Sequence, residues 1–218
     1  MTDRIGRLKK PAAERSPRDL YETPFWVTDL FLRHPNVRLA LSGRQPSGHD
    51  PCCGNAAIQG AVTNFEHEIG RELICKWFLS DIAPGEHASA YDVAPPLAVN
   101  FLAADRFTSY LPGSICLTNP PYSRALEFVE KSVETFELTA MLLGISFLES
   151  LKRHEWLKAH PPTLYVISER ADFTGEHQAK FGLAWFAWAH ARATEWARIV
   201  ADGRVHMLGL REETGYRS

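Results

Sequence analysis

The sequence predicts a single α/β domain built on a doubly wound, mostly parallel β-sheet. Short apolar runs alternate along the chain with segments of helical periodicity, and several runs end in a turn that contains an acidic residue or proline. A rhythm of strands separated by helices is typical of a parallel sheet with helices on both faces. The length of 218 residues suits one such domain with a continuous core better than two.

Apolar runs bounded by turn-forming or charged residues mark the expected strands. In chain order they are the segment into HDPCCGN (49–55), ELICKWFLSD (72–81), SICLT (114–118), LTAMLLGISFL (138–148), TLYVISE (163–169), LAWFAWAHA (183–191) and VHMLGL (205–210). VRLALSG (37–43) is a candidate short first element, and VNFLA (99–103) is a further short apolar run. Helical spacing follows Gly54 and recurs in RALEFVEKSVETF (124–136), so helices are expected between strands.

Charge is spread unevenly along the chain. The net charge is −2, but residues 1–18 hold six Lys or Arg against Asp3 and Glu14, a local +4 that leaves −2 − 4 = −6 on the other 200 residues. An acidic body is a poor non-specific binder of nucleic acid. We therefore expect residues 1–19 to be a basic, flexible segment, either solvated or in contact with phosphate, ahead of one domain at 20–218.

The composition disfavours several classes of protein. No apolar stretch approaches the roughly 18 residues that a membrane helix needs, and the N-terminus lacks the apolar core of a signal peptide, so we expect a cytoplasmic protein without a membrane partner. The four cysteines, Cys52, Cys53, Cys75 and Cys116, form no CxxC pair, which favours buried thiols over zinc ligands or disulfides. No metal site is expected.

Three of the expected strands end in turns that suit a ligand, namely DPCCGN (50–55), SDIAP (80–84) and TNPPY (118–122). In a parallel sheet, ligands gather beyond the carboxyl ends of the strands. Gly54 would let the backbone approach a ligand at the start of the next helix. Asp81 could accept hydrogen bonds from a ribose, or could cap a helix. Together these turns suggest a cofactor that contains a nucleoside.

The tetrapeptide Asn119-Pro120-Pro121-Tyr122 directly follows one of the expected strands. A tight turn is the simplest interpretation, but the two prolines also remove two backbone donors and fix φ. The backbone carbonyls and the Asn119 side-chain oxygen can then form a rigid cluster of hydrogen-bond acceptors without a competing N–H. Acceptors held in this way suit an NH₂ group.

In their nature and order these motifs resemble those of S-adenosylmethionine-dependent amino-methyltransferases, specifically the DNA adenine-N6 enzymes that carry D/N-PP-Y/F. The order is similar to the gamma arrangement of that family, with YETPFWVTDLF (21–31) first, then DPCCGN, SDIAP, NFL (100–102) and NPPY. The resemblance covers roughly residues 20–210. It implies a Rossmann-like methyltransferase domain, S-adenosylmethionine as the cofactor and DNA as the partner.

The resemblance also assigns residues to the cofactor. It implies that Tyr21 and Thr23 contact the methionine end, that Asp50 and Gly54, with Cys52 in the same turn, hold the amino-acid moiety, that Asp81 holds the ribose, and that Asn100 and Phe101 contact the adenine ring. Two positions depart from the commoner pattern. Ala56 stands where many members have the second glycine of a Gly-x-Gly turn, and Asn100 replaces a commoner aspartate.

By the same resemblance, the catalytic residues are Asn119, Pro120, Pro121 and Tyr122. The lone pair of an aromatic amine is delocalised into the ring, so the amine is a poor nucleophile. The Asn119 side-chain oxygen and the Pro120 carbonyl would draw its hydrogens out of plane and localise the pair. Tyr122 would stack on a base flipped out of the duplex, close to the sulfonium methyl, which would move by direct displacement.

Contacts beyond this site are less well defined by the sequence. Phe173 is a candidate for a second aromatic face that steadies the flipped base, or a core residue. Lys152 and Arg153 are candidates for phosphate contacts, or part of a solvated helix face.

The alternatives to DNA adenine-N6 methyl transfer are methyl transfer to adenine N6 in RNA, methyl transfer to glutamine N5 in protein, and a non-catalytic relative. The Pro51-Cys52 pair resembles the nucleophile dipeptide of cytosine-C5 enzymes, but its place in the cofactor turn disfavours that chemistry. The oligomeric state is not indicated.

Overall fold

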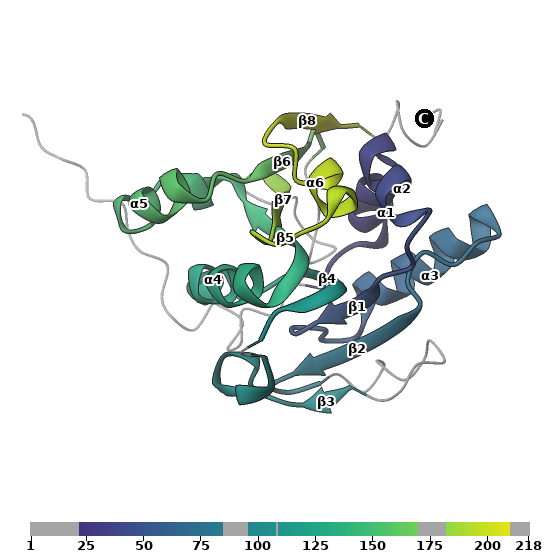
Figure 1. Ribbon diagram of the computed structural model, residues 1–218, viewed down its shortest axis with the longest axis horizontal. Helices are drawn as coiled ribbons and strands as arrows, with labels where there is room; N and C mark the ends of the chain where they lie inside the picture. Colours follow the sequence, from purple (N-terminus) through teal and green to yellow (C-terminus); the bar gives the residue numbers. More distant parts are fainter. Residues whose placement is uncertain (1–21, 85–95, 108, 170–181, 210–218) are drawn as a thin grey trace, which may run out of the picture.

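The computed structural model describes residues 22–84, 96–107, 109–169 and 182–209, which form an eight-stranded β-sheet flanked by helices (Figure 1). The strands are β1 (Ser47–Asp50), β2 (Lys76–Asp81), β3 (Leu97–Ala98), β4 (Leu111–Thr118), β5 (Phe136–Gly144), β6 (Thr163–Ile167), β7 (Leu183–Ala189) and β8 (Val205–Leu208). Their order in the sheet is β3-β2-β1-β4-β5-β7-β6-β8. β7 is antiparallel to β5 and to β6, and the other neighbouring pairs are parallel. The predicted mostly parallel sheet is confirmed.

Helices cover both faces of the sheet. They are α1 (Phe25–Arg33), α2 (Pro35–Leu41), α3 (Ala57–Ile69), α4 (Ala125–Thr135), α5 (Leu151–Ala159) and α6 (Glu195–Val200), with α4 and α5 on the left in Figure 1 and the others on the right. Successive side chains of β5 point to opposite faces of the sheet and pack into two different hydrophobic cores. Leu138 and Leu142 pack into the core that contains α1, α2, α3 and α6, whereas Met141 and Leu143 pack into the core beside α4 and α5. A strand covered on both faces is expected to be a continuous apolar run, and the second half of β5, Ala140–Gly144, follows this pattern.

The described part of the chain also contains short 3₁₀ helices, and they account for two differences from the sequence prediction. They are η3 (Phe101–Ala103), η4 (Asp105–Phe107), η5 (Tyr122–Arg124) and η6 (Ile145–Leu148). The apolar run at 99–103 is mostly η3, because β3 ends at Ala98 and the Asn100 side chain then accepts the Leu102 N–H over 3.1 Å. The predicted strand at 138–148 likewise ends at Gly144, and η6 follows it.

The candidate element at 37–43 is helix rather than strand. Pro35 occupies the first turn of α2, and His34 Nδ1 accepts the Asn36 N–H over 3.3 Å, so both signals start a helix at this point. The predicted strand at 72–81 begins only at Lys76. Upstream of it, the Glu66 carboxylate accepts the N–H groups of Leu73 and Ile74, which holds these residues in a turn.

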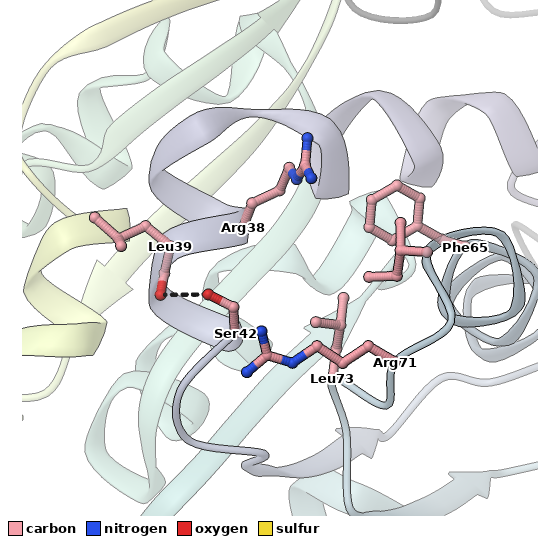
Figure 2. Close-up of a pocket in the computed structure, with 7 residues that line it drawn as sticks. Arg38, Leu39, Ser42, Phe65, Arg71 and Leu73 are labelled. Atoms are coloured by element: carbon pink, nitrogen blue, oxygen red, sulfur yellow. Dashed lines mark hydrogen bonds between the residues drawn. The ribbon is translucent and has the colours of Figure 1, made fainter.

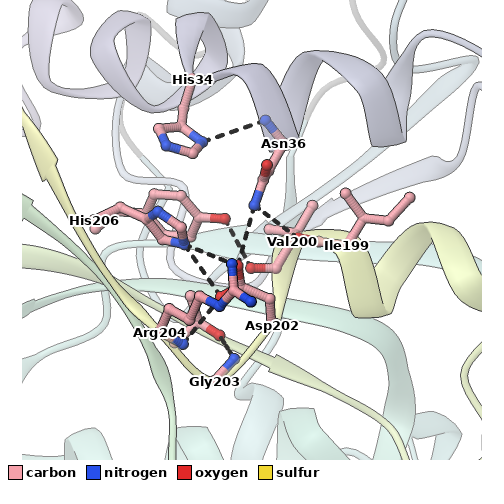
Figure 3. Close-up of polar contacts among 10 residues, drawn as sticks. His34, Asn36, Ile199, Val200, Asp202, Gly203, Arg204 and His206 are labelled. Carbon is pink, nitrogen blue, oxygen red and sulfur yellow. Dashed lines mark hydrogen bonds and ion pairs between the residues drawn. The ribbon is translucent and has the colours of Figure 1, made fainter.

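A network of polar contacts lies beside β8, the strand at one edge of the sheet (Figure 3). Asn36 Nδ2 on α2 donates to the Ile199 carbonyl over 3.1 Å and to Asp202 Oδ2 over 3.2 Å. His206 on β8 lies 3.1 Å from the same carboxylate, and Tyr165 donates to the Val200 carbonyl over 2.7 Å. The network joins α2 to α6 and β8, on the side of the sheet away from β1 and β2.

Some expectations fall outside the described residues. These are the basic segment at 1–19, Tyr21 and Phe173. Within the described part of the chain, no helix is both long enough and apolar enough to cross a membrane.

Candidate functional site

The carboxyl ends of β2, β1 and β4 lie side by side because these strands are consecutive neighbours in the sheet. Asp81, Asp50 and Thr118 are their last residues. Thr118 Oγ1 donates a hydrogen bond of 2.6 Å to Asp50 Oδ1, and both side chains are buried. The three expected turns therefore meet at one edge of the sheet. Thr118 is a site residue that the motifs did not indicate; its signal is a hydroxyl at the end of a buried strand, next to Asn119.

The turn between β1 and α3 is tied to both aspartates. Asp50 Oδ1 accepts the Cys52 N–H, and Asp81 Oδ2 accepts the Gly54 N–H, each over 3.1 Å. The Cys53 N–H donates to the Ser80 carbonyl of β2, also over 3.1 Å. These bonds fix the path of the turn. A carboxylate has about four lone-pair positions, so Asp81 keeps capacity to accept further donors from a ligand.

Two residues of this turn have a left-handed backbone. Gly54 has a φ of +49°, and Ala56, directly before α3, has a φ of +62°. An L-residue in this region is strained by about 1–2 kcal/mol, whereas glycine adopts it freely. Ala56 is also fully buried against Cys53 and Leu79. Its conformation suits the resemblance, in which many members have glycine at this position.

The Asp50 carboxyl titrates near neutrality. Burial raises its pKa to about 7, although hydrogen bonds from Thr118 and from the Cys52 N–H act to lower it, and the charge of Asp81 raises it further. A cation bound close by would favour the ionised form. Asp50 is 1% exposed, so it does not contact a ligand directly. It affects ligand binding by fixing the turn and by its charge.

The cysteines of the site are not activated nucleophiles. Burial, reinforced by the charges of Asp50 and Asp81, raises the pKa of Cys52 well above its usual value. Since the thiolate is the reactive form, this environment argues against cytosine-C5 chemistry. Cys53 and Cys116 are buried thiols, as the sequence predicts, and Cys52 is half-buried. The same prediction is wrong for Cys75, which is exposed in the turn ahead of β2.

The tetrapeptide after β4 presents two acceptors. Asn119 Nδ2 donates to Thr23 Oγ1 over 3.0 Å, which turns Oδ1 of the same amide to the opposite side. The Pro121 carbonyl accepts an N–H of η5 over 3.0 Å, whereas no donor among the described residues contacts the Pro120 carbonyl. Tyr122 is half-buried and packs against both hydrophobic cores, so its ring is held at the edge of the sheet.

The two residues after β3 that the resemblance assigns to the adenine ring lie in different surroundings. The Asn100 side chain is exposed, as a ligand contact requires. The Phe101 ring, however, is 1% exposed and stacks in the core on Phe128 and Phe136, with ring centroids 5.6 Å and 6.2 Å apart. The Phe101 side chain therefore packs in the core, and the contact of this residue with an adenine ring stays a prediction.

The two basic candidates on α5 have different surroundings. Lys152 is exposed. Arg153 donates to the carbonyls of Phe147 and Ser146 over 2.6 Å and 3.1 Å, and its guanidinium lies 4.6 Å from the centre of the Phe147 ring. Arg153 thus stabilises the end of η6, which leaves Lys152 as the better candidate for a phosphate contact.

A separate cavity of about 330 Å³ lies between α2 and the C-terminal half of α3 (Figure 2). Arg38 and Arg71 flank its apolar wall of Phe65 and Leu73. It shares no residue with the turns after β1, β2 and β4. In the described ranges, no group of three or more His, Cys, Asp or Glu is arranged to hold a metal ion.

Comparison with known proteins relates the chain to methyltransferases by fold. No protein-family model and no curated protein matches it. A Listeria monocytogenes protein described as a class I S-adenosylmethionine-dependent methyltransferase superposes with a TM-score of 0.57 and 13% identity over 87% of this chain and 64% of that one. For the M protein of the type I restriction enzyme EcoKI, the TM-score is 0.58, with 16% identity over 89% and 49% of the two chains.

A third solved structure is similar over most of its own length. A Pyrococcus horikoshii protein described as an RNA methyltransferase gives a TM-score of 0.55 and 10% identity over 85% of this chain and 91% of that one. The three superpositions show a shared fold, and at identities of 10–16% they show the fold alone. The chain therefore has the single-domain α/β fold of the Rossmann-like methyltransferases, and it spans 64% and 49% of the lengths of the first two proteins.

Proposed function

We propose that the chain transfers a methyl group from S-adenosylmethionine to the exocyclic N6 amine of adenine in DNA. The observation that carries the proposal is the arrangement at the end of β4. There the Asn119 amide is oriented by Thr23, beside a Pro120 carbonyl that accepts no hydrogen bond from the described residues. Two fixed acceptors next to each other match the two hydrogens of an amine.

The residues around β1 and β2 fit the proposed cofactor. Asp81 is an acidic residue at the end of the second strand, where carboxylates accept ribose hydroxyls in nucleotide-binding sheets of this kind. Asp50 and Asp81 together give this edge negative charge, which suits the sulfonium and ammonium groups of S-adenosylmethionine. Asn100 is exposed at the neighbouring end of β3 and would meet the adenine of the cofactor. When bound, the cofactor supplies an electrophilic methyl group.

The chain's own residues would activate the target amine. Hydrogen bonds from the amine to Asn119 Oδ1 and to the Pro120 carbonyl draw its hydrogens out of the ring plane, and the nitrogen lone pair becomes available. Once the nitrogen carries the methyl group it is positively charged, and it releases one of these two protons to solvent. Tyr122 would stack on the flipped base, and an aromatic face near a positive centre is favourable by about 0.5–2 kcal/mol. Catalysis by such groups depends on geometry that is fixed before the reaction.

DNA is the substrate that the motif resemblance favours, and the fold it shares with the EcoKI M protein is consistent with this choice. Lys152 would contribute a phosphate contact that carries no sequence information. Adenine in RNA is the second candidate, because the similar Pyrococcus horikoshii protein is described as an RNA methyltransferase.

Incubation with S-adenosylmethionine carrying a labelled methyl group tests the proposal. Duplex DNA, total RNA and protein extract should be offered in parallel, with Asn119→Ala as the inactive control. We expect label in DNA as N6-methyladenine, lost in the variant. Label found only in RNA or protein would redirect the proposal to that substrate, and failure of the folded protein to bind S-adenosylmethionine would overturn it.

A further inference from the structure

Lys131 on α4 makes an unusual set of contacts with the segment that carries Asn100. Its Nζ donates to the carbonyls of Phe101, Leu102 and Ala104 over 2.8 Å, 3.3 Å and 2.9 Å. It also lies 5.2 Å from the centre of the Phe101 ring. An ammonium group has three protons, so the whole donor capacity of Lys131 is directed at the backbone of η3 and the residue that follows it.

These contacts are not those of an ordinary surface lysine. Glu127 and Glu134 lie four residues before and three residues after Lys131 on the same helix, at the spacing of helical ion pairs. Glu127 pairs with Arg124 instead. In the described part of the chain, Lys131 forms no ion pair with a carboxylate. It donates to backbone carbonyls instead. Burial lowers its pKa, and the nearby charge of Asp105 opposes that shift.

Further contacts from α4 extend the same anchoring. Thr135 Oγ1 donates to the Phe107 carbonyl over 2.9 Å, at the end of η4. Phe128 stacks on Phe101 from the same helix. Because α4 begins directly after η5, one rigid helix connects the tetrapeptide that ends at Tyr122 with residues 100–107.

We propose that Lys131 is a positioning residue for the cofactor. By holding three carbonyls, it fixes the backbone at 100–104 so that the Asn100 side chain is already in place for the adenine of S-adenosylmethionine. This inference rests on the proposed function. A segment that is ordered before binding loses less conformational freedom when the ligand binds, so the protein binds the ligand more tightly. Lys131 itself does not touch the reacting groups.

The substitution Lys131→Met tests this role, because it keeps the length of the side chain and removes the three donors. Lys158→Met on α5, at an exposed position, is the matched control. We expect Lys131→Met to weaken S-adenosylmethionine binding about tenfold by calorimetry, and turnover at saturating cofactor to stay within about twofold. Lys131→Arg should restore part of the affinity, since it still presents several donors.

Hydrogen exchange of the cofactor-free protein gives an independent readout. Amides of residues 100–107 should exchange faster in Lys131→Met and unchanged in Lys158→Met. Equal affinity and equal exchange in wild type and Lys131→Met would overturn the inference. If the wild type binds no S-adenosylmethionine, the proposed function fails, while exchange still decides whether Lys131 orders the segment. Should Lys131→Met not fold, Thr135→Val removes one anchor, and we expect a smaller change in the same direction.

Discussion

The Asn119 side chain donates a hydrogen bond to Thr23 over 3.0 Å, although 96 positions separate the two residues in the chain. Thr23 is buried directly ahead of α1, and α1 is itself tied to the sheet by a 3.0 Å hydrogen bond from Trp185 Nε1 to the Val27 carbonyl. The segment before α1 is therefore a fixed part of the site. The motif resemblance assigns Thr23 to the methionine end of the cofactor. The hydrogen bond gives Thr23 a second role, because it orients the Asn119 side chain, the proposed acceptor for the target amine.

Substitution of Thr23 separates these two roles. Thr23→Val removes the oxygen that accepts from Asn119 Nδ2, so the amide loses this orienting hydrogen bond and Oδ1 is held less firmly toward the substrate. We expect kcat to fall on the order of 10- to 100-fold, the scale of a misplaced catalytic group, with cofactor affinity within a few-fold. Thr23→Ser keeps the hydroxyl and should retain activity. A loss confined to cofactor affinity would assign Thr23 to the cofactor alone.

Asn119→Ala removes the acceptor itself. Because that acceptor is proposed to act on the amine in the transition state and not on the cofactor, methyl transfer should fall by at least about 10²-fold. Binding of S-adenosylmethionine, measured by calorimetry, should stay within a few-fold of wild type. Substantial turnover by the folded variant would contradict the amine-acceptor mechanism.

Much of the fold and of the edge where the turns meet follows from local patterns. Residues 114–118 and 163–167 are apolar runs closed by turn signals, and such runs predict strands without knowledge of their neighbours. Asp50 and Asp81 end neighbouring parallel strands, so their turns meet at one edge, as the sequence predicts. Local signals also account for the helix that begins after Ala56.

What the sequence could not predict depends on long-range contacts. The burial of the Phe101 ring is decided by Phe128 and Phe136, which lie 27 and 35 positions further along the chain. Arg153 looks like a solvated cation until the fold brings the η6 carbonyls beside it. The late start of β2 depends on the Glu66 carboxylate, and no propensity scale contains that contact.

Asp81→Ala should weaken binding of S-adenosylmethionine. It removes the proposed ribose acceptor and also the partner of the Gly54 N–H, so the turn loses one of its ties. Loss of a hydrogen bond to a charged group costs ~1.5–3 kcal/mol, or roughly 10- to 150-fold in affinity. Calorimetry is the measurement, and Glu72→Ala, an exposed acidic position ahead of β2, is the control. Unchanged affinity in a folded Asp81→Ala protein would remove this residue from the site.

Ala56 offers a test of backbone strain against packing. Ala56→Gly relieves a backbone strain of about 1–2 kcal/mol, which stabilises the folded state. Two effects oppose this gain: loss of a buried methyl group costs about 0.8 kcal/mol, and the greater conformational freedom of glycine in the unfolded state costs roughly 0.5–1 kcal/mol. These effects nearly cancel, so the free energy of unfolding should stay within about 1 kcal/mol of wild type. Ala56→Val, branched at a left-handed position, should lose more than about 2 kcal/mol. Denaturant titration measures both; a large loss in Ala56→Gly would show that packing dominates.

The raised pKa of Asp50 predicts that cofactor binding depends on pH. A cationic cofactor favours the ionised carboxylate, and in the free protein that form predominates only above about pH 7. Below this pH, binding must be coupled to loss of a proton, so the affinity for S-adenosylmethionine should rise as pH increases from about 5.5 to 7 and level off above it. Asp50→Asn cannot lose a proton and should show a flatter profile over the same range.

The same group makes a prediction for the cofactor-free protein. Its folded-state pKa of about 7 lies above the ordinary value of 3.8, so the folded state binds more protons than the unfolded state between these two values. The stability that Asp50 contributes is therefore fully present below about pH 4 and is lost as pH rises toward 7. Thermal unfolding at pH 5 and pH 8 should show a larger loss on raising the pH in wild type than in Asp50→Asn, and saturating S-adenosylmethionine should reduce that difference. An identical pH response of the two proteins would mean that Asp50 is ionised in the fold at neutral pH, and the pH dependence of binding would then have to come from another group.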